Sequence, residues 1–273
     1  MTIQFFSLAL AVVGGTLLAA GPVAAQHFDV FVGRPSAGVQ TAFGGIEVDT
    51  GGISLFERVF ESEMGEDPFD GTYTSGDPGF NHPADDAALP VGAASLLAGD
   101  EIFVTALSLT AGGVTESLFF WNGVGSVAFA PPSSVSFAVD TGSMTGSIGT
   151  AGAGGGFDDH PFFVLDDGDA NAATFPAPGI YLAAFQAKVA DLAPTVPLYL
   201  VMGTEGLITP EFLGVSQAEF DMLTDDDLEE ALESVIEMAV EHVERNVAVP
   251  EPSLLVLVGV ALGSVGLIIR RRW

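Results

Sequence analysis

The chain contains no cysteine among its 273 residues. This absence excludes disulfide frameworks, thiolate zinc sites and cysteine nucleophiles. Tryptophan is also scarce, with two residues, whereas phenylalanine accounts for 21. Phenylalanine usually lies in the core of a β-rich protein. A folded body must therefore be stabilised by its own apolar core or by bound ions.

Basic residues are nearly as scarce, because seven Lys and Arg stand against 36 Asp and Glu. Between Gln26 and Val249 the basic residues are Arg34, Arg58, Lys188 and Arg245. Such an acidic surface repels phosphates, so we expect no nucleic-acid partner. It suits an aqueous exterior and attracts divalent cations, although simple solubility is an equally ordinary reason for it.

Sequence motifs of catalysis are missing as well. The chain has no Gly-x-Ser-x-Gly elbow, phosphate-binding loop or His-Glu-x-x-His helix. Acidic residues are so numerous that a carboxylate pair for glycoside hydrolysis cannot be singled out. We therefore predict a protein without enzymatic activity, and a secreted hydrolase is the weakest alternative.

The N-terminus has the layout of a secretory signal peptide. Residues 3–20 are uncharged and mostly apolar, and Gly21-Pro22 follows them. The small residues Val23 and Ala25 suit cleavage before Gln26. We predict that residues 1–25 are a signal peptide and that the protein is exported. A buried helix or an uncleaved anchor is the alternative.

The C-terminus has three consecutive parts. The motif Val249-Pro250-Glu251-Pro252 comes first, the apolar segment 254–269 second, and Arg270-Arg271-Arg272-Trp273 last. A 16-residue helix spans roughly 24 Å at ~1.5 Å per residue, and arginine side chains extend its reach toward the bilayer surface. We predict a transmembrane helix at 254–269, with the tail 270–273 kept cytoplasmic by its positive charge.

This tripartite end resembles the PEP-CTERM sorting signal, and the resemblance covers residues 247–273. It implies processing by an exosortase near Pro250, Glu251 and Pro252, with Val249 before them and Arg270, Arg271 and Arg272 as the basic cluster. It also implies anchoring in the inner membrane before sorting, a final place at the cell surface or outside a Gram-negative bacterium, and an association with exopolysaccharide. An ordinary single-span anchor is the alternative.

Residues 26–214 read as a β-rich ectodomain. Short apolar runs alternate with Gly, Pro, Asp and Ser clusters, which predicts a mainly β fold of the β-sandwich or jelly-roll-like type. The expected strands are 27–32, 101–109, 117–121, 135–139, 179–190 and 196–202. Asn122-Gly123 favours a hairpin turn after 117–121. Segments 61–88 and 144–159 are rich in Asp and Gly and are expected to be exposed loops.

Residues 215–246 read as a helical segment. Ser216 and Glu219 form a capping-box pattern, and Thr224 precedes three aspartates at a helix start. Apolar residues from Leu228 to Val243 follow helical spacing. We expect an amphipathic helix that docks on the β-domain, with a stalk above the membrane as the alternative.

Two groups of residues are candidate metal ligands. Asp166, Asp167, Asp169 and Asn171 offer the oxygen ligands that Ca²⁺ prefers, without EF-hand spacing. His160 and His27 lie beside acidic residues, a combination that suits Zn²⁺. No motif demands a cofactor. The sequence thus predicts a structural or interaction protein of the envelope or extracellular matrix, with a surface module for Ca²⁺, Zn²⁺ or exopolysaccharide as the alternative.

Overall fold

The computed structural model describes residues 28–47, 50–84, 88–111, 113–143, 146–169 and 174–247. The predicted signal peptide, His27, Asn171, the sorting motif, the membrane helix 254–269 and the arginine tail lie outside these ranges. None of the helices inside them combines the length and the apolarity that crossing a bilayer requires.

Within the described residues, the larger sheet has nine strands in the order β12-β15-β5-β4-β17-β16-β8-β13, and β11 also pairs with β16. The strands are β4 (Val59–Asp67), β5 (Thr72–Ser75), β8 (Glu101–Leu107), β11 (Leu118–Trp121), β12 (Ser136–Asp140), β13 (Ser147–Thr150), β15 (Phe162–Asp166), β16 (Ile180–Val189) and β17 (Leu198–Thr204). The pairing of β4 with β17 is parallel, and the others are antiparallel.

The smaller sheet has six strands among the described residues, in the order β14-β6-β1-β2-β3 with β7 also paired to β1. The strands are β1 (Phe28–Pro35), β2 (Ala42–Glu47), β3 (Ile53–Leu55), β6 (Phe80–His82), β7 (Ala93–Ala94) and β14 (Phe157–Asp159). A separate ribbon joins β9 (Leu109–Ala111) to β10 (Val114–Glu116).

The two sheets share one hydrophobic core. Val30 and Phe80 come from the smaller sheet, and Phe163, Phe185 and Leu200 come from the larger one. Phe185 meets Phe80 at a ring-centroid distance of 5.8 Å and Phe163 at 5.9 Å. The prediction of a mainly β fold is confirmed, and the curled sheets are consistent with a β-sandwich-like arrangement.

Helices follow the last strand. They are the 3₁₀ turn η2 (Glu205–Leu207), α2 (Pro210–Leu213), α3 (Gln217–Phe220) and α4 (Asp225–Asn246). The predicted capping box of Ser216 and Glu219 is present at α3, and Thr224 and Asp227 form a second one at the start of α4. These reciprocal side-chain bonds satisfy backbone N–H groups that have no partner within the helix.

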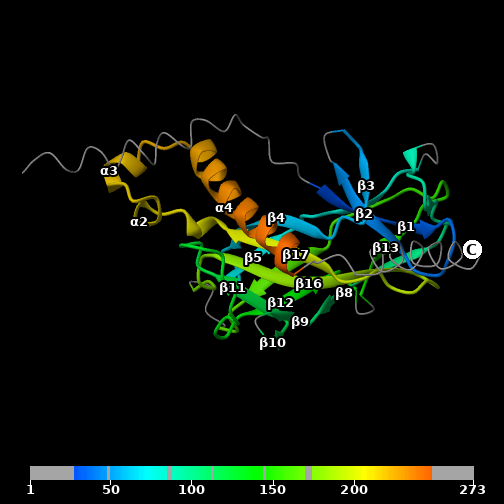
Figure 1. Ribbon diagram of the computed structural model, residues 1–273, viewed down its shortest axis with the longest axis horizontal. Coiled ribbons are helices and arrows are strands. Elements are labelled where there is room, and N and C mark those ends of the chain that lie inside the picture. Colours follow the sequence, from blue (N-terminus) through cyan, green and yellow to red (C-terminus); the bar gives the residue numbers. More distant parts are fainter. Residues whose placement is uncertain are drawn as a thin grey trace, which may run out of the picture.

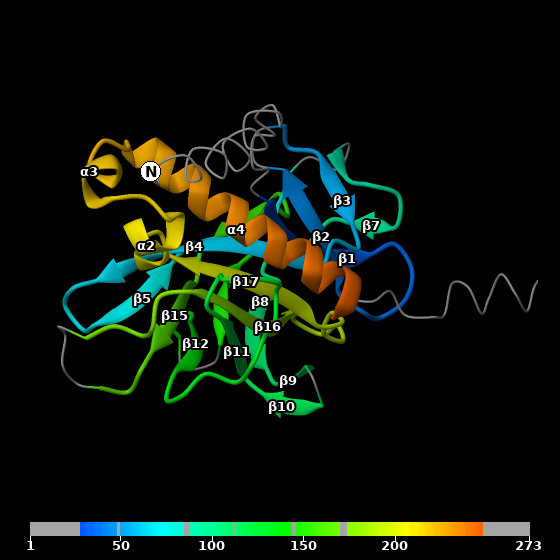
Figure 2. The same cartoon turned by 60° about the vertical axis from the view of Figure 1, so that its left-hand side comes forward.

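Helix α4 lies across the outer face of β4 and β17, as Figures 1 and 2 both show. Its buried stripe, Leu232, Val235, Ile236, Ala239 and Val243, joins a second hydrophobic cluster with residues of β16 and β17. The expectation that the helical segment docks on the β-domain is therefore confirmed. The reason is that β16 and β17 are apolar on both faces, so the outer face also needs a cover.

Both predicted exposed loops are wrong over much of their length. Segment 61–88 contains most of β4 together with β5 and β6, and segment 144–159 contains β13 and β14. In β4 the glutamates Glu61 and Glu63 alternate with the buried Ser62 and Met64. The high charge of this segment concealed the two-residue alternation that marks a strand.

The predicted hairpin at Asn122-Gly123 is also wrong. Strand β11 pairs with β16. Phe120 also forms an isolated β-bridge with Ala130, and the connection between these two residues is longer than a two-residue hairpin. The Asn122 side chain accepts the N–H of Val124 at 3.1 Å, so it builds a local turn instead of a two-residue hairpin.

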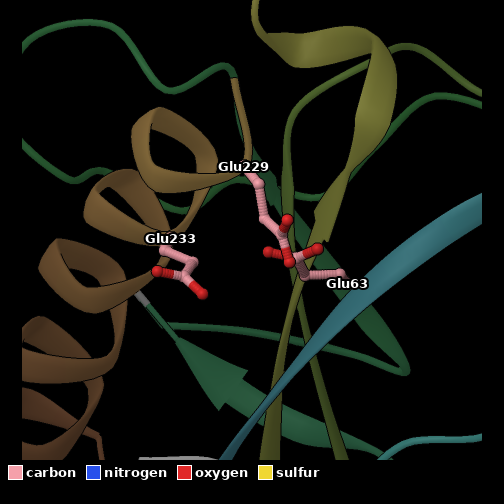
Figure 3. Close-up of side chains that lie close together, drawn as sticks. All are labelled: Glu63, Glu229 and Glu233. Carbon is pink, nitrogen blue, oxygen red and sulfur yellow. The ribbon is translucent and has the colours of Figure 1, made fainter. Parts of the chain in front are cut away.

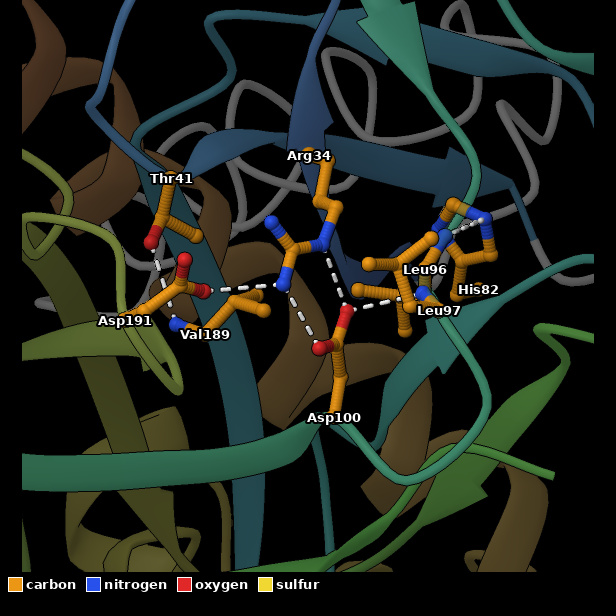
Figure 4. A network of polar contacts seen from close by, with 8 residues as sticks. All are labelled: Arg34, Thr41, His82, Leu96, Leu97, Asp100, Val189 and Asp191. Atoms are coloured by element: carbon orange, nitrogen blue, oxygen red, sulfur yellow. Dashed lines mark hydrogen bonds and ion pairs between the residues drawn. The ribbon is translucent and has the colours of Figure 1, made fainter.

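An arginine ties the smaller sheet to the larger one (Figure 4). Arg34 at the end of β1 donates from Nε and Nη2 to the two carboxylate oxygens of Asp100, each at 2.7 Å. Its Nη2 also donates to Asp191 at 2.8 Å. Asp100 directly precedes β8 and accepts the Leu97 N–H at 2.8 Å. The hydrogen bonds from Arg34 hold the pKa of Asp100 below its ordinary value of 3.8.

We expect Gly203→Ala to destabilise the protein by about 1–3 kcal/mol, the usual cost of overpacking. A Cβ at this position of β17 would lie 2.6 Å from Cδ1 and 2.7 Å from Cγ1 of Ile236 on α4. Chemical denaturation measures the change. Gly154→Ala is the matched control, because a Cβ there meets no atom within 4 Å. Equal stability of the two variants would contradict the close approach of α4.

We expect Arg34→Ala to lower the free energy of unfolding by about 3 kcal/mol, because it leaves the nearly buried Asp100 carboxylate without its cation. Asp191→Asn, at a 72% exposed partner, should cost less than about 1 kcal/mol. The pKa of Asp100 is depressed in the folded state. The pair therefore makes its full contribution to the free energy of unfolding at pH values above the pKa that Asp100 has in the unfolded chain. This contribution is lost as the pH falls through the folded value. The difference between wild type and Arg34→Ala should consequently shrink below about pH 4. Urea titrations across this range would contradict the assignment if the difference stayed constant.

Candidate functional site

The candidate site is an acidic cavity of about 390 Å³ beside β4. Residues 59–64 of β4 pair with β17 along one edge, and β5 begins to pair with β4 only at Gly65. The cavity lies beside this first part of the strand, and its wall includes five carboxylates. It is lined by Phe28, Asp29, Glu61, Ser62, Glu63, Asp77, Pro78 and Glu229.

Three glutamates converge at the side of the cavity that faces α4. Glu63 projects from β4, and Glu229 and Glu233 lie one turn apart on α4. Figure 3 shows the carboxylates of Glu63 and Glu229 close to each other. One carboxylate oxygen from each residue lies within 4.8 Å of the other two. Like charges this close repel each other, and a bound divalent cation would offset that repulsion.

His160 lies near the cavity, beside Asp77. Its Nδ1 is 3.0 Å from the carbonyl oxygen of Gly76 and 3.7 Å from Oδ1 of Asp77. Its Nε2 is 3.6 Å from Oδ1 of Asp158. The contact with a carbonyl oxygen places the ring proton on Nδ1, which leaves Nε2 as an acceptor in the neutral ring.

Asp29 contributes a carboxylate at the start of β1. Burial raises its pKa above the ordinary value of 3.8, whereas the hydrogen bond from the Gly79 N–H and the nearby His160 lower it. Repulsion from Asp77 and Asp158 adds to the upward shift. The site therefore concentrates negative charge around one histidine.

The backbone around Asp77 is held by serine hydroxyls. Ser62, which is 3% exposed, donates from Oγ to the carbonyl oxygen of Asp77 at 2.7 Å. The Asp77 N–H donates to Oγ of Ser75 at 3.1 Å. The ring of His160 lies against Gly79, where a Cβ would collide with it. These contacts fix the orientation of the Asp77–Pro78 peptide group against β4.

The sequence-predicted metal residues that the structure describes lie at the two ends of β15. Asp166 ends β15, and its Oδ1 accepts the Gly168 N–H at 2.7 Å, while Oδ1 of Asp167 accepts the Asp169 N–H at 2.8 Å. Within the described ranges, the group of three acidic or histidine ligands that comes together is the glutamate group above, not this turn. These carboxylates instead stabilise the turn. His160 lies at the other end of β15, and Asn171 and His27 lie outside the described residues.

A second cavity of about 430 Å³ has a different character. Its lining includes the rings of Phe120 and Phe175, with the carboxylate of Asp167 beside them. Trp121, the single tryptophan before the C-terminal segment, is not an exposed platform for a sugar. It is 3% exposed and donates from Nε1 to the carbonyl oxygen of Val124 at 3.2 Å.

Sequence reasoning missed the three glutamates. Glu63 fell inside a segment that was expected to be a loop, and Glu229 and Glu233 fell inside the predicted amphipathic helix, where no metal ligand was predicted. Their spacing of four residues placed them on one helix face, which was the available signal. Their proximity to Glu63 depends on how α4 crosses β4, and no local pattern encodes that crossing.

Comparison with models of known protein families, with curated proteins and with solved structures finds no match for this chain.

Proposed function

We propose that this is an exported protein of the bacterial envelope or extracellular matrix, with a structural or interaction role and no enzymatic activity. The observation that carries the proposal is the C-terminal sequence, in which the Pro-Glu-Pro motif, an apolar segment and an arginine cluster follow one another. That order resembles the PEP-CTERM signal, and it makes an exosortase and the inner membrane the first partners.

The folded body supports this proposal. Two hydrophobic clusters, one shared by the sheets and one beneath α4, stabilise it without cysteine. Its stability is thus independent of the redox state of its surroundings. The excess of acidic residues keeps the surface hydrated and the protein soluble outside the cell. Exopolysaccharide is the matrix component we propose as its neighbour.

We expect Glu251→Ala to leave an unprocessed, membrane-retained form when the full chain is expressed in a Gram-negative host that has an exosortase. The physical reason is that the motif supplies the only charge between Arg245 and Arg270, so the replacement removes the feature a processing enzyme can recognise there. Immunoblots of membrane and extracellular fractions give the answer. Glu237→Ala, an exposed position on α4, is the control and should be processed normally. Normal processing of both variants would indicate a plain membrane anchor.

The second candidate function is binding of a divalent cation, and the convergence of Glu63, Glu229 and Glu233 favours it. Three carboxylates from two elements supply hard oxygen ligands of the kind that Ca²⁺ takes, and the neighbouring Asp29 and Asp77 add negative charge to the same cavity. A cation there would join α4 to β4. Zn²⁺ is the competing ion, because His160 is close by.

We expect Ca²⁺ to raise the melting temperature of the mature protein, since an ion that binds only the folded state at about 100 times its Kd adds about 2.7 kcal/mol. Titration calorimetry with Ca²⁺ and with Zn²⁺ measures the affinity. The double variant Glu229→Gln, Glu233→Gln should bind at least about tenfold more weakly, a loss of about 1.4 kcal/mol. Glu237→Gln on the same helix should bind as wild type does. No heat and no thermal shift with either ion would refute this candidate.

A further inference from the structure

The contacts around one peptide bond carry an inference that does not depend on sorting or on metal binding. We propose that the chain cleaves its own backbone between Asp77 and Pro78, in a single-turnover reaction promoted by mild acid. Ser62 contacts the carbonyl oxygen of this bond, the Asp77 carboxylate is exposed, and the adjacent cavity gives water access to the bond.

The chemistry follows from the two residue types. A carboxylate oxygen of Asp77 attacks the Asp77 backbone carbonyl carbon, and the new C–O bond closes a five-membered cyclic anhydride. The C–N bond to Pro78 breaks, and the proline nitrogen takes a proton and leaves as a secondary amine. Water then opens the anhydride to two carboxyl groups. The sum is peptide plus water giving an Asp77 C-terminus and a Pro78 N-terminus, with no redox change. Attack within one residue has the entropic advantage of an intramolecular reaction.

The fold polarises the bond that would break. Oγ of the buried Ser62 donates to the Asp77 carbonyl oxygen at 2.7 Å. Negative charge develops on this oxygen when the carboxylate attacks, so the Ser62 hydroxyl occupies the place of an oxyanion donor. Because Ser62 lies on β4 in the larger sheet, the donor is held in place before the reaction begins.

The nucleophilic carboxylate is exposed and lies beside a histidine ring. The Asp77 side chain is 68% exposed, and its Oδ1 lies 3.7 Å from Nδ1 of His160. The other carboxylates near this place are those of Asp29, Asp158 and Glu61. The cavity that Asp77 and Pro78 line admits the water for hydrolysis.

The chain contains its own comparison, because Asp67–Pro68 is its second Asp-Pro bond. There Oδ1 of Asp67 accepts the Phe69 N–H at 2.9 Å, and the Asp67 carbonyl oxygen accepts the Gly71 N–H at 3.0 Å. Both carbonyl oxygens therefore accept a hydrogen bond, at 3.0 Å in Asp67 and at 2.7 Å in Asp77, and the Asp67 carboxylate is in addition held by the turn that follows it. The two bonds have the same intrinsic chemistry, so a difference in their cleavage reports on the fold.

Cleavage would leave the body assembled. Strands β4 and β5 precede the cut, and their partners β17 and β15 follow it. The two fragments would remain joined by these pairings and by the shared core. The product is a nicked protein with a free proline N-terminus at the acidic cavity, and it would separate into fragments only under denaturing conditions.

The experiment incubates the purified protein at pH 5 and at pH 7.5 and follows both Asp-Pro bonds by denaturing electrophoresis and intact mass. We expect fragments ending at Asp77 and beginning at Pro78, formed faster at pH 5 and at a rate independent of protein concentration. In the native protein this bond should break at least about tenfold faster than Asp67–Pro68, equivalent to about 1.4 kcal/mol of barrier. In 6 M guanidinium the two rates should become equal.

Variants separate the parts of the proposal. Asp77→Ala should abolish cleavage at this bond, and Ser62→Ala should slow it by about 100-fold, the usual effect of losing an oxyanion donor. Circular dichroism confirms that each variant is folded, and the Asp67–Pro68 rate serves as the internal reference in each. Equal native rates at the two bonds, or an unchanged rate in folded Ser62→Ala, would overturn the proposal.

Discussion

Strands β16 and β17 are buried on both of their faces, and most of the architecture follows from the need to cover them. A sheet strand with two apolar faces is stable only between two layers. One face packs into the core shared with the smaller sheet, and the other packs beneath α4. Gly203 permits the close approach of the helix, because it leaves space for Ile236 where any side chain would collide. The position of α4 therefore depends on a glycine as much as on the apolar stripe of the helix.

The same layering explains why the acidic cavity exists. Helix α4 crosses β4 and brings Glu229 and Glu233 to Glu63, while the smaller sheet brings Asp29 to the neighbourhood of Asp77. The apolar layers fix the backbone on each side of the cavity, and carboxylates are the side chains left at its wall. The carboxylates lie close together because the elements that carry them pack through apolar contacts. A cation, a proton or a reaction at this cavity can relieve the repulsion between its carboxylates.

Basic residues are rare in this protein, and one of them, Arg34, has a specific structural role. Arg34 bridges Asp100 and Asp191, so it joins the end of β1 to the beginning of β8 and to the turn after β16. Two further contacts reinforce this junction, since Oγ1 of Thr41 accepts the Val189 N–H and donates to the Ala193 carbonyl oxygen. A planar guanidinium can satisfy two carboxylates at once, which a lysine ammonium does with less geometric definition.

Local sequence alone determined the strands with clear apolar alternation, the cap residues of α3 and α4 and the amphipathic stripe, because each depends on neighbours within a few residues. It also carried the predicted signal peptide and sorting signal, which lie beyond the described residues and remain predictions. It failed for β4, β5 and β14, where acidic and glycine-rich segments become strands through pairing with distant partners. Only the tertiary structure brought Glu63 to Glu229, and His160 and Ser62 to Asp77. The physical reason is that these contacts join residues far apart in the chain, and their positions are decided by how the two sheets and α4 pack.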